Sequence, residues 1–520
     1  MIQLKDILNE NSMKLQKTMR SYLSNKAFAV GCIVMVSSLL IRLYYFPYGV
    51  PLTLDALMYF FYATDITILK NFPTGYHFPN NGWPTLLSVF FSIMPSHGFL
   101  DHMMLQRLIS VIISVLTVIP LYFLCRKFFD RTYSIIGITL FAFEPHIIQN
   151  SLLGITEPLY IFLVTASLCT FVSKRPFATY ASFAFAAFCS IVRYEGLVLF
   201  AVLTMLFFIK YRHERKAIIR YAIAVGIFSM IILPMMYVRT QTIGSEGLVN
   251  HVVAGGNVAV DLSTKESSGP IMFFGNGLFN FFKYLGWIML PFLVFLAPIG
   301  LILIIKKRQS ASATILISLV ILSIPAFYAY SRYLQETRYL LVLIPLLSIL
   351  SLYPIKKLEN KTERKKLVLI IILVLVLTST VVFLQVKKYD YDRQRESFML
   401  GMEISHIAKG VNDFYPEDVY LVPAQLPDHW PILRSSIQNH ILIVPTDGFN
   451  SLEKYIEFGK NNGLTHLVVD DSPTRPSFLR DVLYNSHSYP YLKQVFDSSD
   501  AGFKYHAKIY EIDYNKFNLE

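Results

Sequence analysis

Cysteine is scarce in this sequence, which holds four such residues among 520. All four, Cys32, Cys125, Cys169 and Cys189, lie within or at the ends of apolar segments. Their placement predicts no disulfide framework, and their spacing does not fit a zinc site. We interpret them as packing residues, because free cysteine behaves mainly as a small hydrophobe.

Charged residues are also few. Asp, Glu, Lys and Arg make up 16% of the chain, against about 25% in a typical soluble domain. Hydrophobic residues make up 54%, and the mean hydropathy is +0.47. This composition excludes an ordinary soluble globular protein. The formal net charge is +12, but the basic residues are scattered over short connections, so we expect no nucleic-acid partner.

Long apolar segments account for this composition. A segment of about 20 apolar residues can span a bilayer as a helix, and helices satisfy their own backbone hydrogen bonds in lipid. The sequence therefore predicts an α-helical polytopic membrane protein with about eleven transmembrane helices, in contact with membrane lipids. The predicted spans are residues 27–45, 101–124, 133–150, 158–173, 177–192, 196–210, 218–238, 281–305, 311–330, 338–354 and 367–386.

Lysine and arginine concentrate in alternate connections between these spans. The basic connections include residues 126–131, 210–220, 306–308 and 356–366. Because basic loops stay on the cytoplasmic side, we expect a multi-pass protein of the cell membrane with a cytoplasmic N-terminus. An odd number of spans then places the C-terminus outside. The larger outer segments would be residues 46–100, 239–280 and 387–520.

The composition changes after the last predicted span. Residues 387–520 hold charges, turns and short alternating segments, which are typical of strands interleaved with helices. We expect a transmembrane domain at 1–386 and a small extracytoplasmic α/β domain at 387–520. The predicted strands are 418–423, 441–445, 465–470 and 506–513, and the predicted helices are 393–408, 451–462 and 475–484.

Ionisable residues gather at the outer ends of the predicted spans. A charge at mid-span costs about 2.5–3.5 kcal/mol on insertion scales, so charges that persist near the bilayer need a reason. These residues come from many helices and could line one cavity on the outer face; alternatively, they are interfacial caps and ion pairs. The set comprises Asp55, Asp101, Arg107, Glu144, Glu157, Arg193, Glu195, Arg239, Arg332, Glu336 and Arg338.

The first outer segment, residues 46–100, is predicted to be structured. Asp55 lies in an amphipathic stretch just after the first span, and residues 72–84 are dense in aromatic and turn residues. Residues 84–94 form an apolar stretch that is too short to span a bilayer, so we expect a helix along the membrane surface.

Together these features resemble the GT-C glycosyltransferases, in which an Asp follows the first span and juxtamembrane helices come next. Within that superfamily the chain is most similar to the protein O-mannosyltransferases and the lipid A aminoarabinose transferases of family 39 type. The order of the matching pieces covers most of residues 27–354. Besides Asp55 these pieces are Arg107, Glu144-Pro145, Ile155-Thr156-Glu157-Pro158, Arg193-Tyr194-Glu195-Gly196 and Glu336-Thr337-Arg338-Tyr339.

The resemblance implies an inverting glycosyltransferase. Its donor would be a sugar on a polyprenyl (dolichyl) phosphate, and its acceptor a hydroxyl of a protein, glycan or lipid on the outer face. Asp55 would be the general base, since a hydroxyl loses its proton as the new bond forms. Arginine binds phosphate through paired, charge-assisted hydrogen bonds. The residues implied for the donor phosphate are Arg107, Arg193, Arg338 and Arg332, and those implied for orienting the substrate are Glu144, Glu157, Tyr59 and Trp83.

Some of these roles have alternatives. Glu144 and Glu157 could cap helices beside their prolines instead of orienting a substrate. The mechanism requires no cofactor and assigns no metal ligands, although relatives differ in their use of a divalent metal ion.

The chain also departs from the family pattern. Ala56 follows Asp55 where many relatives carry a second acid. The Trp-Trp-Asp motif of oligosaccharyltransferases is absent, so we do not expect oligosaccharide transfer to asparagine. Alternative functions are a surface-glycan polymerase or ligase with lipid-diphosphate donors, a non-enzymatic transporter or flippase, and a structural membrane protein. Transport would be favoured by mid-span charges and internal repeats. The sequence has few such charges and no internal repeat.

Overall fold

The computed structural model describes residues 26–73, 80–94, 99–265, 269–307, 310–360, 364–387, 391–412, 442–471, 475–504 and 506–519. The chain divides into two compact units. The helix-bundle unit comprises Met1–Phe46, His77–Leu87 and Leu105–Lys388. The sheet unit comprises Pro47–Tyr76, Ser88–Met104 and Tyr389–Glu520.

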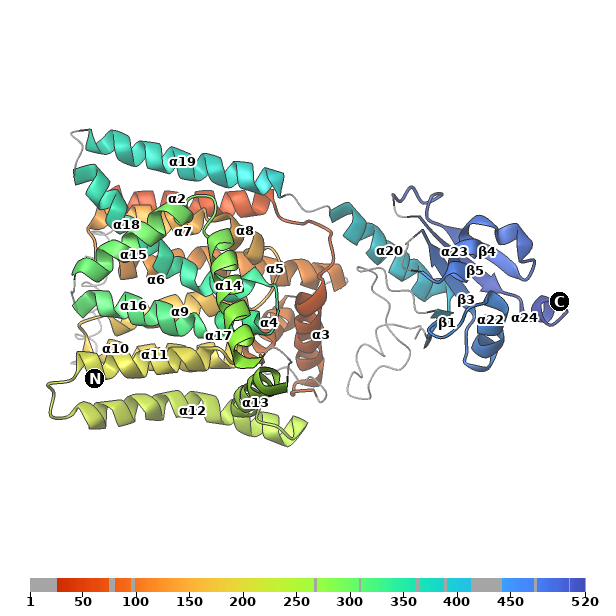
Figure 1. Ribbon diagram of the computed structural model, residues 1–520, viewed down its shortest axis with the longest axis horizontal. Coiled ribbons are helices and arrows are strands. Elements are labelled where there is room, and N and C mark those ends of the chain that lie inside the picture. Colours follow the sequence, from red (N-terminus) through yellow and green to blue (C-terminus); the bar gives the residue numbers. More distant parts are fainter. Residues whose placement is uncertain are drawn as a thin grey trace, which may run out of the picture. The chain divides into compact units, whose positions relative to one another are not determined.

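Helices account for nearly all of the described structure up to residue 387, and in the helix-bundle unit most of them run alongside one another (Figure 1). The elements are α2 (Lys26–Tyr44), α3 (Leu54–Leu69), α4 (Gly82–Ile93), α5 (Phe99–Leu116), α6 (Val118–Cys125), α7 (Arg131–Ala142), α8 (Pro145–Ser151), α9 (Glu157–Phe171), α10 (Pro176–Val192), α11 (Gly196–Lys210), α12 (Ala217–Ile243), α13 (Val249–Lys265), α14 (Gly269–Ile288), α15 (Leu293–Lys307), α16 (Ser310–Leu322), α17 (Ile324–Ser331), the 3₁₀ helix η1 (Thr337–Leu343), α18 (Ile344–Asn360) and α19 (Lys365–Val386).

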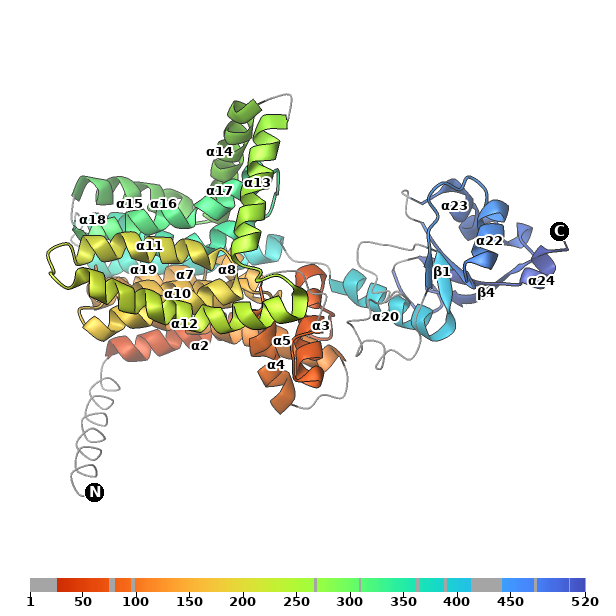
Figure 2. The same ribbon diagram turned by 90° about the horizontal axis from the view of Figure 1, so that it is seen from below.

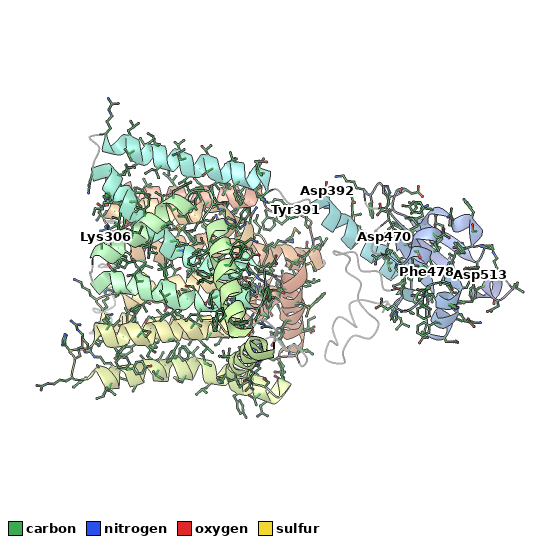
Figure 3. The ribbon with its side chains drawn as sticks, in the orientation of Figure 1. Lys306, Tyr391, Asp392, Asp470, Phe478 and Asp513 are labelled. Atoms are coloured by element: carbon green, nitrogen blue, oxygen red, sulfur yellow. The ribbon has the colours of Figure 1, made fainter. Side chains whose placement is uncertain are left out.

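Helical structure lies at each of the eleven predicted spans, and the membrane-protein fold class is confirmed. Among the described residues, five helices are long and apolar enough to cross a membrane, and a bent pair makes a sixth. These five are Leu100–Cys125, Ala217–Ile243, Ser312–Ser331, Thr337–Asn360 and Leu367–Val386. The remaining apolar helices are shorter than a full span. Lys306, from a connection assigned to the cytoplasmic side, lies near the end of α15 (Figure 3).

The predicted span 133–150 is wrong as a single helix. α7 ends at Ala142 and α8 begins at Pro145, because proline disfavours helical backbone in the residue before it. The carboxylate of Glu144 accepts a hydrogen bond from the Ile147 N–H at 2.7 Å and so caps α8. The Thr380 hydroxyl of α19 donates to the buried carbonyl of Phe143, at the break, at 2.6 Å. The break is therefore stabilised by partners from other parts of the bundle.

Arg42 of α2 supports the same break from within the bundle. Its side chain is fully buried. Its guanidinium donates to the Ala142 carbonyl at 3.0 Å and to the hydroxyls of Ser114 and Ser151 at 3.2 Å each. It also donates to the carbonyl and hydroxyl of Ser38 in its own helix. One arginine thus connects α2, α5, α7 and α8.

The predicted span 281–305 is also wrong as a single helix. Its first part belongs to α14 and its second part to α15, and the two helices meet at 115°. Pro291 lies in the connection, where it cannot donate a backbone hydrogen bond to continue α14. Figure 2 shows α13 and α14 running across the direction of the other bundle helices. The expected outer segment 239–280 is therefore largely helical.

The sheet unit contains the expected α/β structure. Its five strands have the order β2-β1-β3-β5-β4, in which β2, β1 and β3 are parallel and β5 and β4 are antiparallel to their neighbours. The predicted strands at 441–445, 465–470 and 506–513 are confirmed, β1 and β4 were not predicted, and residues 418–423 lie outside the described residues. The elements are α20 (Tyr391–Ile407), β1 (Gly410–Asn412), β2 (Leu442–Val444), α22 (Leu452–Asn461), β3 (His466–Asp470), α23 (Ser477–Tyr484), η2 (Ser486–Ser488), β4 (Leu492–Asp497), β5 (Ala507–Ile512) and α24 (Tyr514–Phe517).

Both faces of the sheet are covered by helices. On β3, Leu467 and Val469 pack with residues of α22 and α23, whereas Val468 packs with residues of α20. This alternation follows from the two-residue period of a strand. Asp470 ends β3, is fully buried, and binds Arg475 through two hydrogen bonds of 2.9 and 3.1 Å. Figure 3 shows Asp470 and Phe478 in this part of the fold.

The sheet unit also holds α3 and the C-terminal part of α4, from the first outer segment. The side chains of Phe60 on α3 and Phe91 on α4 pack with ring centroids 5.8 Å apart. Phe91 in turn stacks on His102 of α5 at 4.5 Å. A helix is present at the expected 84–94, as α4, and its place along the membrane surface stays a prediction.

We predict that Arg42→Met lowers the thermal stability of the protein. Methionine keeps an unbranched side chain of similar length, so the main change is loss of the donors to Ala142, Ser114 and Ser151. A buried polar group left without a partner costs about 1–3 kcal/mol. Thermal unfolding of the purified protein in detergent measures the effect, and Arg131→Met, at an exposed position on α7, is the control. Equal melting of the two variants would show that Arg42 does not stabilise the break.

Candidate active site

Four helix ends bring acidic and basic side chains together in the helix-bundle unit. Glu157 begins α9, Arg193 follows α10, Glu195 precedes α11, and Arg338 lies in η1. The turn from α10 to α11 is tight at Gly196, where an added Cβ would lie 2.7 Å from the carbonyl oxygen of Cys189. We call Glu157, Arg193, Glu195, Glu336 and Arg338 the ionic cluster.

Arg193 lies at the centre of the ionic cluster. Its guanidinium binds both carboxylate oxygens of Glu195, at 2.7 and 3.3 Å. A second edge donates to Glu157 at 2.5 Å and to the Thr156 hydroxyl at 3.0 Å. The side chains of Glu157 and Glu195 are only 3% and 6% exposed. The positive charge of Arg193 is therefore balanced by two buried carboxylates.

Arg338 has a different environment within the same cluster. Its Nε atom pairs with the carboxylate of Glu336 and lies 3.9 Å from the Glu157 oxygen that Arg193 also binds. The side chain of Arg338 is 23% exposed and that of Glu336 is 54% exposed. The cluster thus includes a buried ion pair at Arg193 and a partly exposed one at Arg338.

Aromatic rings surround the two guanidinium groups. Arg193 lies 5.8 Å from the ring centroid of Tyr160 and 5.9 Å from that of Tyr339. Arg338 lies 5.8 Å from the ring centroid of Tyr339. Cation–π contacts of this kind are stronger where water is excluded, so the tyrosines help to hold both arginines in place.

Glu144 lies outside the ionic cluster, at the break between α7 and α8. Besides capping α8, its carboxylate is 2.8 Å from Nδ1 of His146, and both residues are buried. The His146 ring packs 4.9 Å from Phe383 and 6.2 Å from Trp287. Within the described part of the chain, no three His, Cys, Asp or Glu side chains form a group that could hold a metal ion.

Three other expected residues of the helix-bundle unit make contacts of their own. Arg107 is buried on α5. Arg332 is exposed, and its guanidinium lies over the ring of Tyr328, to whose hydroxyl it donates at 3.2 Å. Trp83 is fully buried, and its indole N–H donates to the Gly154 carbonyl at 3.2 Å. Trp83 therefore anchors the connection between α8 and α9.

Asp55 and Tyr59 belong to the sheet unit. Both lie on α3, with Asp55 half-buried in the first helical turn and Tyr59 buried one turn later. The N-terminal end of a helix favours a negative charge because of the helix dipole. Asp55 thus occupies a position in α3 where an acidic residue is favourable.

Some residues of the cluster received no role from the sequence. Glu195 and Glu336 were noted as outer-face charges, but the structure makes them the direct partners of Arg193 and Arg338. The sequence did hold a signal, because each acid is two residues from its arginine. His146 and Arg42 were not noted, although the proline after Glu144 marked the helix break on which both act.

Comparisons with solved structures establish the fold. A crystal structure of ArnT from Cupriavidus metallidurans bound to undecaprenyl phosphate has a TM-score of 0.56 and 12% identity, and the likeness covers 93% of this chain and 97% of that one. The apo oligosaccharyltransferase of Archaeoglobus fulgidus has a TM-score of 0.54 and 13% identity, with 86% of this chain and 70% of that chain covered.

The archaeal oligosaccharyltransferase AglB from the same organism, in complex with an inhibitory peptide and a dolichol-phosphate, has a TM-score of 0.52 and 15% identity, with 85% and 69% covered. No protein-family model and no curated protein matches the sequence. The expected GT-C fold is thus confirmed. Because the likeness to ArnT covers 93% of this chain, it extends beyond residues 1–386 into the C-terminal part.

We predict that Arg193→Met destabilises the protein more strongly than Arg42→Met. Removal of Arg193 leaves the carboxylates of Glu157 and Glu195 buried without their main counter-charge. Breaking a buried ion pair from one side costs about 3–5 kcal/mol. Arg220→Met is the matched control, since Arg220 pairs with the partly exposed Glu214 at 2.6 Å. Thermal unfolding in detergent measures the melting temperatures of the three variants. Similar melting temperatures for Arg193→Met and Arg220→Met would contradict a structural role for Arg193.

Proposed function

We propose that this chain is a membrane glycosyltransferase that moves a sugar from a polyprenyl-phosphate donor to an acceptor hydroxyl. The donor is a hexose such as mannose on a polyprenyl (dolichyl) phosphate, and the acceptor is a protein, glycan or lipid. We also propose that the N-terminus is cytoplasmic and that the domain at 387–520 is extracytoplasmic, as the alternating basic connections predict.

The observation that carries this proposal is the fold shared with ArnT over nearly the full length of both chains. That structure is bound to undecaprenyl phosphate, and the archaeal AglB complex holds a dolichol-phosphate. Two proteins that share this fold therefore bind a polyprenyl-type phosphate. A transporter or structural function has no comparable support.

The surroundings of the arginines favour particular ones for the donor phosphate. Arg193 would have to give up buried carboxylates, at about 3–5 kcal/mol, so we assign it to positioning Glu157. At Arg338 a phosphate would replace the half-exposed Glu336, and exposed ion pairs contribute about 0–1 kcal/mol. Arg332 is exposed and has no ion pair among the residues that the structure describes. Arg338 and Arg332 are therefore the stronger candidates, with the buried Arg107 in reserve.

The proposed reaction is a single displacement at the anomeric carbon. The acceptor oxygen forms a bond to that carbon while the bond from carbon to the phosphate oxygen breaks, with inversion. The hydroxyl proton passes to the carboxylate of Asp55, which acts as general base. The leaving polyprenyl phosphate keeps the electron pair of the broken bond, and arginine stabilises the added negative charge. The role of Asp55 rests on its place in the chain and in the first turn of α3.

Sugar transfer tests the function directly. We predict that the purified protein transfers mannose or glucose from a synthetic polyprenyl-phosphate sugar to a hydroxyl acceptor, and that Asp55→Asn lowers the rate by about 10²–10⁴-fold. Donor binding should change little, because the arginines rather than Asp55 hold the phosphate. The rate is measured with radiolabelled sugar and the donor affinity by calorimetry.

Asp101→Asn is the control for this variant, since Asp101 is an exposed acid in the first turn of α5. Near-normal transfer by Asp55→Asn, with only a slightly lower melting temperature, would show that Asp55 merely stabilises the start of α3. Absence of transfer from every polyprenyl-phosphate sugar to every acceptor class would overturn the function itself.

Donor binding tests the choice of arginines. We predict that Arg338→Ala and Arg332→Ala each weaken binding of undecaprenyl phosphate by about 10–100-fold, because hydrogen bonds to a charged group contribute about 1.5–3 kcal/mol. Arg220→Ala should bind as the wild type does. Calorimetric titration in detergent measures the dissociation constants. Unchanged binding in both Arg338→Ala and Arg332→Ala would point to Arg107 or to a different phosphate site.

A further inference from the structure

Arg338 pairs with two carboxylates that differ in how firmly they are held. Glu157 is buried and also binds Arg193 at 2.5 Å, so its position does not depend on Arg338. Glu336 is half-exposed, and its carboxylate lies in ion-pair contact with Nε of Arg338 without a hydrogen bond to that atom. Within the described part of the chain, its carboxylate has no other ion pair or side-chain hydrogen bond. Of Glu157 and Glu336, Glu336 is therefore the more easily displaced.

The backbone of Glu336 is fixed although its carboxylate is not. The hydroxyl of the buried Tyr330 donates to the Glu336 carbonyl at 3.0 Å. Glu336 occupies the N-cap position of η1, but its side chain makes no capping hydrogen bond there. The carboxylate can therefore leave Arg338 by side-chain rotation alone. Arg338 keeps its contacts with Glu157 and Tyr339 when that happens.

We propose that Glu336 is an internal competitor for the donor phosphate at Arg338. Its carboxylate pairs with the Arg338 guanidinium when no phosphate is bound. It withdraws when a phosphate binds and returns when the phosphate leaves. This inference rests on the proposed binding of a polyprenyl phosphate by Arg338. It adds a residue that sets the affinity of that site, a role that the proposed transfer reaction does not itself require.

The competition has a consequence for product release. A sugar-linked polyprenyl phosphate is a diester with one negative charge, whereas the released polyprenyl phosphate is a monoester that approaches two charges at neutral pH. An arginine without a competitor would therefore bind the product more tightly than the donor. A carboxylate that returns to Arg338 offsets part of that attraction and favours release.

Replacement of Glu336 by its neutral amide tests the competition. Glu336→Gln should tighten binding of undecaprenyl phosphate to the full-length protein by about two- to fivefold, the range expected for an exposed ion pair. Undecaprenyl phosphate should also inhibit sugar transfer more strongly in this variant, by a similar factor. Glu214→Gln is the matched control, because it removes the carboxylate of the comparable Arg220 pair. That control should leave both quantities unchanged.

A second variant separates direct competition from a general effect of charge. In an Arg338→Ala background, Glu336→Gln should no longer change the affinity, because the contested guanidinium is gone. Equal tightening in both backgrounds would show that Glu336 acts only as a nearby negative charge, and would overturn the proposal. Unchanged or weaker binding by Glu336→Gln, with binding still lost in Arg338→Ala, would overturn it too while leaving the proposed function intact.

Normal binding by Arg338→Ala would instead remove Arg338 from the phosphate site and the competitor with it. Sugar transfer by the wild-type protein would then decide separately whether the glycosyltransferase function stands.

Discussion

The buried pairing of Arg193 with Glu157 and Glu195 is the interaction on which the candidate site depends. It joins the start of α9, the end of α10 and the start of α11, and through Glu157 it reaches Arg338 in η1. The two carboxylates and the guanidinium group of this pairing can share a buried region only because each charge has a partner. Without Arg193 the acids would repel one another, and the remaining positions would have no reason to converge.

Broken helices place polar groups where continuous spans would not. The carbonyls of Ala142 and Phe143 lie at the break between α7 and α8. They accept hydrogen bonds from the side chains of Arg42 and Thr380, respectively. It also turns Glu144 inward to cap α8 and bind His146. Non-helical backbone at membrane depth is tolerated only where its polar groups are satisfied by protein or water. The buried Arg42 is thus explained by the break that it supports.

Arg193 and Arg338 each lie two residues from an acidic partner, but their ion pairs differ in burial. Arg193 precedes its acid by two residues, and Arg338 follows its acid by two residues. The partners of Arg193 are almost fully buried, whereas the main partner of Arg338 is half-exposed. The attraction within the first pair is stronger because water is excluded around it, and water screens the second pair. Glu336 is therefore more easily displaced from Arg338 than Glu157 or Glu195 is from Arg193, which remains part of the framework.

The sequence by itself determined the membrane class, the positions of the apolar helices and most elements of the α/β domain, because hydrophobicity and its period are local properties. It also located most of the charged residues of the cluster, since ionisable groups beside apolar spans are conspicuous. It missed the helix breaks at Glu144 and Pro291, and it grouped Arg193 with Arg338 as equivalent. Only the tertiary structure decided which acid meets which arginine and how deeply each pair is buried. The strength of an ion pair depends on that burial, and burial is set by packing between helices that are distant in the sequence.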